Sequence, residues 1–162
     1  MQAGEQDLSA AMAGKRPTPI IRDAHMLMVR GIDALERNHV EDAVGLLRQS
    51  VELDPGSFLG CLALGIALTK ALEIPAAETA LQQAIRLEPK NFWAHFRMAE
   101  LYQRVGVTLK AKEEFQVALD LAETSEQRKA ARDRIEAEQR REPRRAWRPD
   151  FSGLMAGKNR KK

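Results

Sequence analysis

Histidine and cysteine are the side chains that most often hold metals or act as nucleophiles, and this chain has few of them. The three histidines, His25, His39 and His95, lie far apart in the sequence, and Cys61 has no Cys or His near it at metal-ligand spacing. A glycine-rich phosphate-binding loop and a Gly-x-Ser-x-Gly nucleophile motif are also absent from the sequence. We therefore expect no catalytic site, no metal site and no cofactor.

A basic segment is the second feature that could carry chemistry. Residues 140–162 hold nine Lys or Arg and two acidic residues, a net charge of +7, so the rest of the chain carries −4 of the total of +3. Such a segment can engage the phosphates of nucleic acid or an anionic membrane, and interleaved Trp147 and Phe151 could stack on bases or fill a partner pocket. The alternative is a solubilising tail. The anion-binding candidates, with Trp147, are Arg144, Arg145, Arg148, Lys158, Arg160, Lys161 and Lys162.

Length and composition favour one helical domain. A chain of 162 residues can bury a core without covalent staples, and plentiful Ala, Leu, Glu, Arg and Gln favour helix over sheet. The longest apolar run, Phe58 to Leu68, is too short to span a bilayer, and the first residues contain no apolar signal-peptide region. A single cysteine excludes an intramolecular disulfide. We expect a soluble, cytoplasmic protein.

An internal repeat dominates the sequence. Pro55 and Pro89 each close a similar phrase, Ser-Val-Glu-Leu-Asp-Pro and Ala-Ile-Arg-Leu-Glu-Pro, and their separation is the period of the repeat. A third copy at residues 118–123, one further period along, lacks the proline. Self-similarity at a fixed period of roughly 20–50 residues is the mark of a stacked-repeat architecture. The equivalent upstream positions are Gly31, Gly65 and Ala99; Ala43, Ala77 and Ala111; and Leu47, Leu81 and Phe115.

These repeated positions predict pairs of antiparallel helices. Small residues at Gly65 and Ala77 let two helices approach closely, while large residues such as Leu81 fill the space around the contact. Pro89 has no N–H and clashes with the preceding turn, so it separates one helix from the next. One pair buries only part of its apolar surface, and stacking of about three pairs closes the core.

The pattern resembles the tetratricopeptide repeat family, whose repeat places a large residue, then Leu-Gly, Tyr, Ala, Phe and Pro at fixed offsets. The middle repeat has Cys61, Leu64, Gly65, Leu68, Ala77, Leu81, Ala84 and Pro89 at the family's positions. The first repeat has Leu27, Gly31, Ala34, Ala43, Leu47, Ser50 and Pro55, with Arg30 where Leu is usual. The third has His95, Met98, Ala99, Tyr102, Ala111, Phe115 and Ala118, with Glu123 replacing the proline. Cys61 and His95 thus fill the large-residue position, where packing explains them.

The resemblance covers about residues 24 to 125 and implies an all-α fold, an α-solenoid of three antiparallel helix pairs. We expect a disordered segment over 1–19 and a repeat domain over 20–142, with repeats at about 24–57, 58–91 and 92–125. A capping box at Thr124–Gln127 predicts a polar C-terminal capping helix over about 126–142, which Pro143 ends. Residues 143–162 are expected to form the flexible basic tail.

The resemblance also implies a concave groove lined by the first helix of each repeat. In repeat one the family's groove positions fall on His25, Met28, Ile32 and Leu35. In repeat two they fall on Leu59, Leu62, Ile66, Thr69 and Lys70, and in repeat three on Trp93, Phe96, Arg97, Glu100 and Arg104. The expected groove is apolar over most of its length and polar at one end of the third repeat.

One known use of such a groove finds little support in this sequence. The family's carboxylate clamp, which grips the acidic C-terminus of heat-shock chaperones, uses Lys and Asn where this chain has Met28, Ile32 and Ala63. Only Arg97 matches the clamp. The sequence therefore argues against that function.

Contiguous apolar surface usually marks a binding site or is covered by something. We therefore expect an adaptor or scaffold that holds an apolar peptide or helix of a partner protein, and no small-molecule substrate. The alternative is a groove covered by extra core, by a dimer mate or by the chain's own Leu8 and Met12. Bacterial type III translocator chaperones also have three such repeats and an apolar groove, although they are usually acidic. A nucleic-acid or membrane-surface accessory acting through the tail is the third hypothesis.

Overall fold

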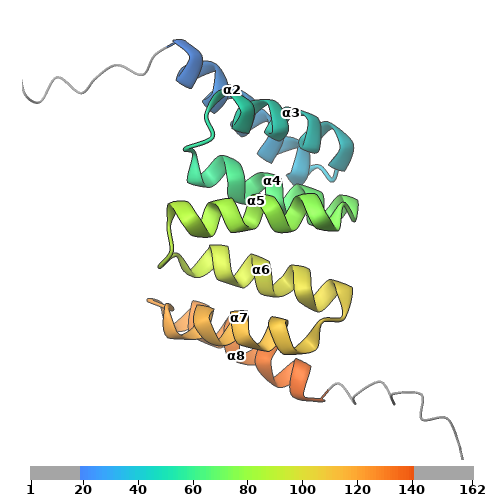
Figure 1. The fold of residues 1–162 in the computed structure, drawn as a ribbon, viewed down its shortest axis with the longest axis vertical. Helices are drawn as coiled ribbons and strands as arrows, with labels where there is room; N and C mark the ends of the chain where they lie inside the picture. The colour runs from blue at the N-terminus through green and yellow to red at the C-terminus, as the bar shows by residue number, and fades with distance from the viewer. Residues whose placement is uncertain (1–18, 141–162) are drawn as a thin grey trace, which may run out of the picture.

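The computed structural model describes residues 19–140, which form seven α-helices and no strand (Figure 1). The all-α fold expected from the sequence is confirmed, and the first helix begins at Pro19, ahead of the expected start of repeat one. The last two residues of the expected capping helix lie outside the described residues. The helices are α2 (Pro19–Glu36), α3 (Val40–Leu53), α4 (Phe58–Ala71), α5 (Ile74–Leu87), α6 (Phe92–Val105), α7 (Thr108–Asp120) and α8 (Ser125–Arg140).

The helices form three consecutive pairs, α2 with α3, α4 with α5 and α6 with α7, which stack along the long axis of the molecule (Figure 1). Helices α2, α4 and α6 pack against one another in succession, whereas the backbones of α3, α5 and α7 do not approach each other closely. The first helices of the pairs therefore lie on the inner side of a curved stack, and the second helices are spread over the outer side. Helix α8 packs on α7 and α6 and closes one end.

The predicted capping box is present at the start of α8. The backbone N–H of Gln127 donates to Thr124 Oγ1 at 3.2 Å, and the Gln127 side-chain oxygen accepts from the N–H of Thr124 at 3.2 Å. Two otherwise unpaired donors of the first turn are thus satisfied reciprocally. Ser57 and Asn91 cap α4 and α6 in the same sense, since their side-chain oxygens accept from the N–H groups of Gly60 and Trp93.

The turn within each helix pair requires a left-handed backbone residue at the same position of the repeat. Asn38, Leu72 and Gly106, each one repeat period from the next, have φ of 61°, 64° and 80°. Glycine and asparagine adopt this conformation readily, because glycine lacks a Cβ and the short polar side chain of asparagine can hydrogen-bond to the nearby backbone. Leucine does not, and Leu72 is also largely exposed. The middle repeat therefore carries a strained turn that its neighbours avoid.

The small residue of each first helix lies directly against a large residue of the second. A Cβ placed on Gly65 would lie 2.5 Å from Leu81 Cγ, and one on Gly31 would lie 2.6 Å from Leu47 Cγ. Both leucines are fully buried. The close approach of the two helices inferred from the sequence is therefore confirmed at these positions, and it leaves no space for a methyl group.

Replacement of Gly65 by alanine should destabilise the protein. The added methyl would overlap Leu81, and overpacking of this kind costs roughly 1–3 kcal/mol, more than the gain of up to about 1 kcal/mol in helix propensity. Gly45→Ala is the matched control, because Gly45 also lies within a helix but a Cβ there meets nothing within 4 Å. Urea unfolding should show a lower free energy of unfolding for Gly65→Ala and a slightly higher one for Gly45→Ala. Equal shifts in the same direction would contradict the packing argument.

Two hydrophobic clusters make up the core of residues 19–140. The larger one fills the first two helix pairs and reaches α6 through Ala94, Met98 and Leu101. The smaller one joins α6, α7 and α8 around Phe96 and Phe115, whose rings meet edge to face. Tyr102 packs against both clusters. The third repeat is therefore tied to the second by a few side chains of α6.

The hydroxyl of Tyr102 donates to Glu78 Oε1 of α5 at 2.7 Å. Burial of the ring, followed by the hydrogen bond to Glu78, raises the pKa of Tyr102 to about 12. Tyr102 is the only tyrosine of the chain, so its titration can be observed directly.

Alkaline titration followed by tyrosinate absorbance should give a Tyr102 pKa near 12 in the folded protein. Because the fold raises the pKa of an acid, its contribution to stability is complete below the unfolded pKa of about 10 and is lost as pH rises towards the folded value. Glu78→Gln should lower the Tyr102 pKa, since the amide still accepts the hydrogen bond but carries no charge. A folded-state pKa near 10 in the unaltered protein would contradict this account.

No helix among residues 19–140 is long and apolar enough to cross a bilayer.

Candidate binding groove

The inner face of the stack is formed by residues that recur every three or four positions on α2, α4 and α6. On α4 and α6 these include Ile66 and Lys70, and Glu100 and Arg104, which occupy equivalent positions in the two repeats. Spacing of three and four residues places them on one face of each helix. Two neighbouring inner helices thus form the walls of a groove.

The exposed apolar surface of the groove is smaller than the sequence suggests. Among the expected groove residues, Leu59 is 56% exposed and Trp93 is 43% exposed. Ile32 and Ile66 are partly buried. Four others are buried in the core and lie below the groove surface: Met28, Leu35, Leu62 and Phe96. Of the polar members, His25, Lys70 and Arg104 are exposed, whereas Thr69, Arg97 and Glu100 are partly buried.

A depression of about 490 Å³ lies between the C-terminal halves of α4 and α6. Three cationic side chains and one carboxylate line it, so the charges of its lining sum to a positive value. Most of these residues are at expected groove positions, and the structure shows that they enclose one pocket. The lining residues are Ile66, Thr69, Lys70, Arg97, Glu100, Gln103 and Arg104.

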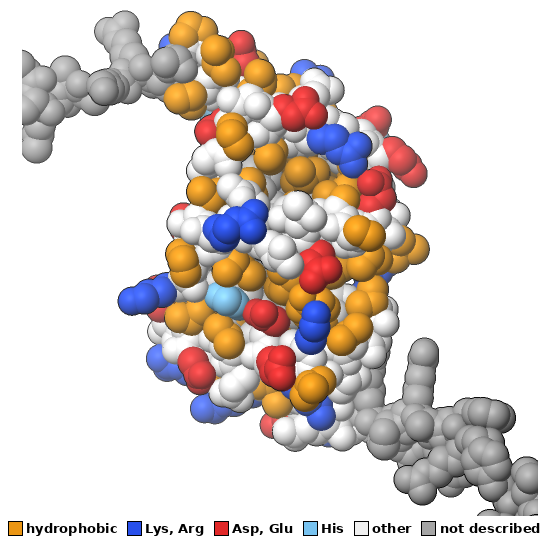
Figure 2. All heavy atoms as spheres, viewed as in Figure 1, with side chains coloured by type: hydrophobic (Ala, Val, Ile, Leu, Met, Phe, Trp, Pro, Cys, Tyr) orange, Lys and Arg blue, Asp and Glu red, His pale blue; other side chains and the backbone are white. Residues whose placement is uncertain are grey.

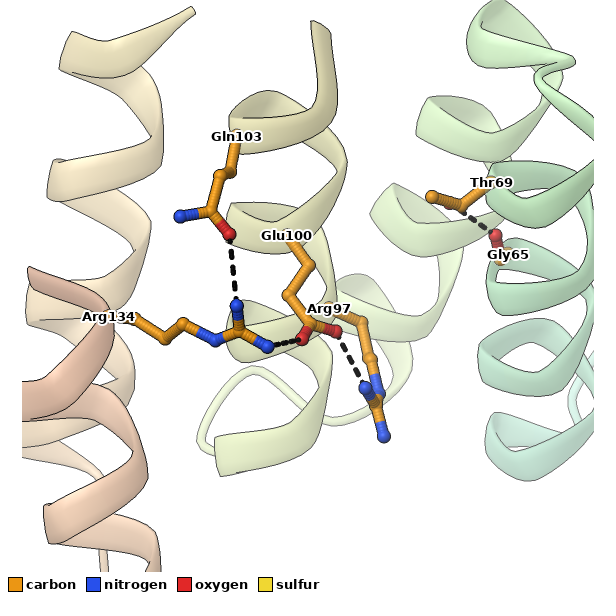
Figure 3. Close-up of polar contacts among 6 residues, drawn as sticks. All are labelled: Gly65, Thr69, Arg97, Glu100, Gln103 and Arg134. Atoms are coloured by element: carbon orange, nitrogen blue, oxygen red, sulfur yellow. Dashed lines mark hydrogen bonds and ion pairs between the residues drawn. The ribbon is translucent and has the colours of Figure 1, made fainter. Parts of the chain in front are cut away.

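Glu100 is held between two arginines from different helices. Arg97 donates to Glu100 Oε2 at 2.6 Å, and Arg134 of α8 donates to Glu100 Oε1 at 3.0 Å. Arg134 also donates to the side-chain oxygen of Gln103 at 3.4 Å. Figure 3 shows Glu100 between the two guanidinium groups, with Arg97 on the side of α6 that faces α4. The only carboxylate in the pocket lining is therefore already paired, which leaves the pocket's other cations available.

The opposite end of the groove is aromatic. The rings of Trp93 and Phe96 lie 6.0 Å apart in an edge-to-face arrangement, and the Arg97 guanidinium lies 5.5 Å from the centroid of the Trp93 ring. These geometries favour an ordered indole, because the cation is attracted to the face of the ring. The partly exposed Trp93 is thus a preorganised apolar surface, and Leu59 occupies the equivalent position of the neighbouring repeat.

The residues at the carboxylate-clamp positions are apolar, and the structure shows them buried or partly buried. Met28 and Ala63 are buried, and Ile32 is partly buried, so none of the three offers a hydrogen-bond donor to a peptide carboxylate. Arg97 is the only clamp-like side chain, and it is engaged with Glu100.

Cys61 and His95 are both explained by contacts that recur at equivalent positions of successive repeats. The Cys61 thiol lies 3.9 Å from the carbonyl oxygen of Pro55, and His95 Nε2 lies 3.0 Å from that of Pro89. His95 also pairs through Nδ1 with Glu114 of α7 at 2.8 Å, so it makes polar contacts as well as packing contacts. Burial, followed by the charge of Asp54, raises the pKa of the Cys61 thiol.

The Cys61 thiol should be unreactive in the folded protein. Its raised pKa lowers the thiolate fraction, and burial blocks reagent access, so labelling with a disulfide reagent should require opening of the fold. The control is Cys61→Ser combined with Gln82→Cys, which moves the thiol to an exposed position on α5. The native thiol should react at least about a hundredfold more slowly than the control at neutral pH, and at an equal rate in denaturant. Equal rates under native conditions would contradict the burial of Cys61.

Metal binding and a surface of one charge sign are the remaining features to consider within residues 19–140. No group of three His, Cys, Asp or Glu side chains in this part of the chain is arranged to hold a metal. In the view of Figure 2, acidic and basic side chains are interspersed with apolar ones, and no single sign of charge dominates the coloured surface. The tail residues from Arg144 to Lys162, and Leu8 and Met12, lie outside the described residues.

Two groove residues were missed by the sequence reasoning. Val29 is 50% exposed on α2 at the position of repeat one that is equivalent to Arg97, and Gln103 lines the pocket at the position equivalent to Thr69. The repeat period alone would have identified both. The link from Glu100 to Arg134 was not readable from the repeat, because Arg134 belongs to the capping helix.

Comparison with known proteins decides the fold. No protein-family model matches the chain, and no curated protein matches it. Solved structures do match: the TPR2B domain of yeast Sti1 aligns with a TM-score of 0.69, over 75% of this chain and 99% of that domain, at 18% identity. This chain has the tetratricopeptide repeat fold.

Other solved structures align with similar scores. The Arabidopsis OM64 domain has a TM-score of 0.66 at 18% identity, over 73% of this chain and 98% of its own. The Yersinia enterocolitica type III secretion chaperone SycD, in complex with a peptide of the translocator YopD, also has a TM-score of 0.66 at 18% identity, over 71% of this chain and 91% of its own. The three-pair solenoid predicted from the repeat is therefore confirmed.

Proposed function

We propose that this tetratricopeptide repeat domain is an adaptor or scaffold that binds an apolar peptide or helix of a partner protein in its groove. The observation that carries the proposal is the exposure of Leu59 and Trp93 on neighbouring inner helices, with the partly exposed Ile66 further along α4. Large apolar side chains kept at the surface of a concave face are typical of binding sites. Neither a cofactor nor a catalytic step is part of the proposal.

Proteins of the same fold support this assignment. The first domain of Spaghetti (RPAP3) is solved bound to the HSP90 peptide SRMEEVD, and SycD is solved with a peptide of YopD. Both structures are peptide complexes on a tetratricopeptide repeat scaffold. The groove of this chain lacks the polar residues of the carboxylate clamp, so we infer a partner segment with apolar anchors.

Two alternatives receive less support. A translocator-chaperone role would use the same groove, but the likeness to SycD is no greater than that to Sti1. A role through the basic tail concerns residues outside those described, and none of these structures is named as a complex with nucleic acid or lipid. We retain the cytoplasm as the proposed compartment, because the single cysteine is a buried free thiol.

The groove can be tested by selecting peptides from a displayed library on the full-length protein, each peptide about a dozen residues long. Selected peptides should carry apolar anchors, and Leu59→Glu combined with Trp93→Glu should abolish their binding, since a charge would have to be buried against the anchor. Binding can be measured by fluorescence anisotropy of the labelled peptides.

Val117→Glu is the matched control for this experiment. Val117 is 40% exposed, similar to Trp93, but it lies on the outer helix α7. Circular dichroism should show the same helicity for all variants, because every replaced side chain is at the surface. If the Val117 variant loses binding as completely as the groove variant, or if the groove variant binds normally, the assignment to this groove is wrong.

A further inference from the structure

We infer that the pocket between α4 and α6 receives an acidic side chain of the bound segment, so the partner is an apolar segment that also carries an Asp or Glu. This inference rests on the proposed peptide-binding function and adds the chemistry of the partner. It is carried by the positive pocket, in which Lys70 and Arg104 lie toward the helix ends remote from Leu59 and Trp93, and Arg97 lies between them and Trp93.

Two of the pocket's cations have no partner in the part of the chain that the structure describes. Lys70 and Arg104 lie in the last turns of α4 and α6, are exposed, and form no ion pair or side-chain hydrogen bond there. Arg97 is already paired with Glu100, and Glu100 is paired again with Arg134. An arriving carboxylate therefore meets two available cations without having to break an existing pair.

The net charge of the lining favours an anionic group. Lys70, Arg97 and Arg104 contribute three positive charges, and Glu100 contributes one negative charge to the same cavity. A side-chain carboxylate is the anionic group that an unmodified peptide carries within its length, so it is the group that we assign to this pocket. The cavity of about 490 Å³ is large enough for a Glu or Asp side chain together with water.

The repeat geometry fixes where the acidic residue should stand in the partner sequence. Lys70 follows Leu59, and Arg104 follows Trp93, by the same interval of eleven positions. At about 1.5 Å per helical residue this interval is about 16 Å. An extended peptide advances about 3.3 Å per residue, so the acid should lie about five residues from the apolar anchor. Ile66 lies between the two ends and offers apolar contact to the residues in between.

This pocket shares Arg97 with the family's carboxylate clamp but none of the clamp's other positions. The clamp positions Met28, Ile32 and Ala63 are apolar, and neither Lys70 nor Arg104 belongs to that set. The inferred ligand is a side-chain carboxylate within a segment, for which the peptide need not end in the groove.

The test uses the displayed-peptide selection on full-length protein, repeated on Lys70→Glu/Arg104→Glu and on the groove variant Leu59→Glu/Trp93→Glu. The matched control is Lys129→Glu/Arg132→Glu, which makes the same change in net charge on exposed positions of α8. If the charge reversal unfolds the chain, the neutral variant Lys70→Gln/Arg104→Gln replaces it in the selection. Each selected acidic peptide is then made with Glu, Gln or phosphoserine at the acidic position.

We expect Asp or Glu to be enriched about five residues from an apolar anchor on the unaltered protein and on the α8 control, and not on the pocket variants. The pocket reversal should weaken the Glu peptide about tenfold and the Gln peptide less than about twofold. Raising salt to about 0.5 M should weaken the Glu peptide selectively.

Each of the following results would overturn the inference. If apolar anchors depend on Leu59 and Trp93 but no acid is enriched, or the enrichment survives the pocket variants, the groove function stands and the pocket assignment is wrong. If phosphoserine binds about tenfold more tightly than Glu, the carboxylate assignment is wrong. If no selected peptide depends on Leu59 and Trp93, the proposed function fails and the inference fails with it.

Discussion

This structure depends on one close contact, in which a glycine of the first helix lies against a buried leucine of the second. The contact recurs in successive helix pairs. Gly31 lies against Leu47, and Gly65 lies against Leu81, with no space for even a methyl group. This contact sets the separation of the two helices in a pair. The separation in turn determines which inner-helix residues are covered by the next pair and which remain at the groove surface.

The repeat allowed most of the fold to be predicted, because its signals are local. Helix ends follow from Pro55 and Pro89, and the start of α8 follows from the Thr124 capping box, all of which depend on neighbours in sequence. Exposure within the groove was harder to predict. Whether a groove-position side chain reaches solvent depends on how closely the helices pack across repeats, and this is why Met28 and Leu62 proved buried while Leu59 proved exposed.

The pocket could not be predicted from the repeat pattern, for a different reason. Its charge balance depends on Arg134, which pairs with Glu100 from a helix that is not part of any repeat. The sequence shows a cation on α8 but not which side chain it meets. The capping helix α8 therefore has two effects. Through Ala131 it covers the end of the core, and through Arg134 it neutralises the one carboxylate that lines the pocket. The state of the groove is therefore coupled to the seating of α8.

The order of the stack also has a consequence for how the chain reaches this structure. Among residues 19–140, no helix contacts another that is more than two helices away in sequence. The contact order is accordingly low, and chain closure between distant segments contributes little to the folding barrier. Folding can begin at one helix pair and proceed to its neighbours, on the roughly microsecond-to-millisecond timescale of helical proteins rich in local contacts.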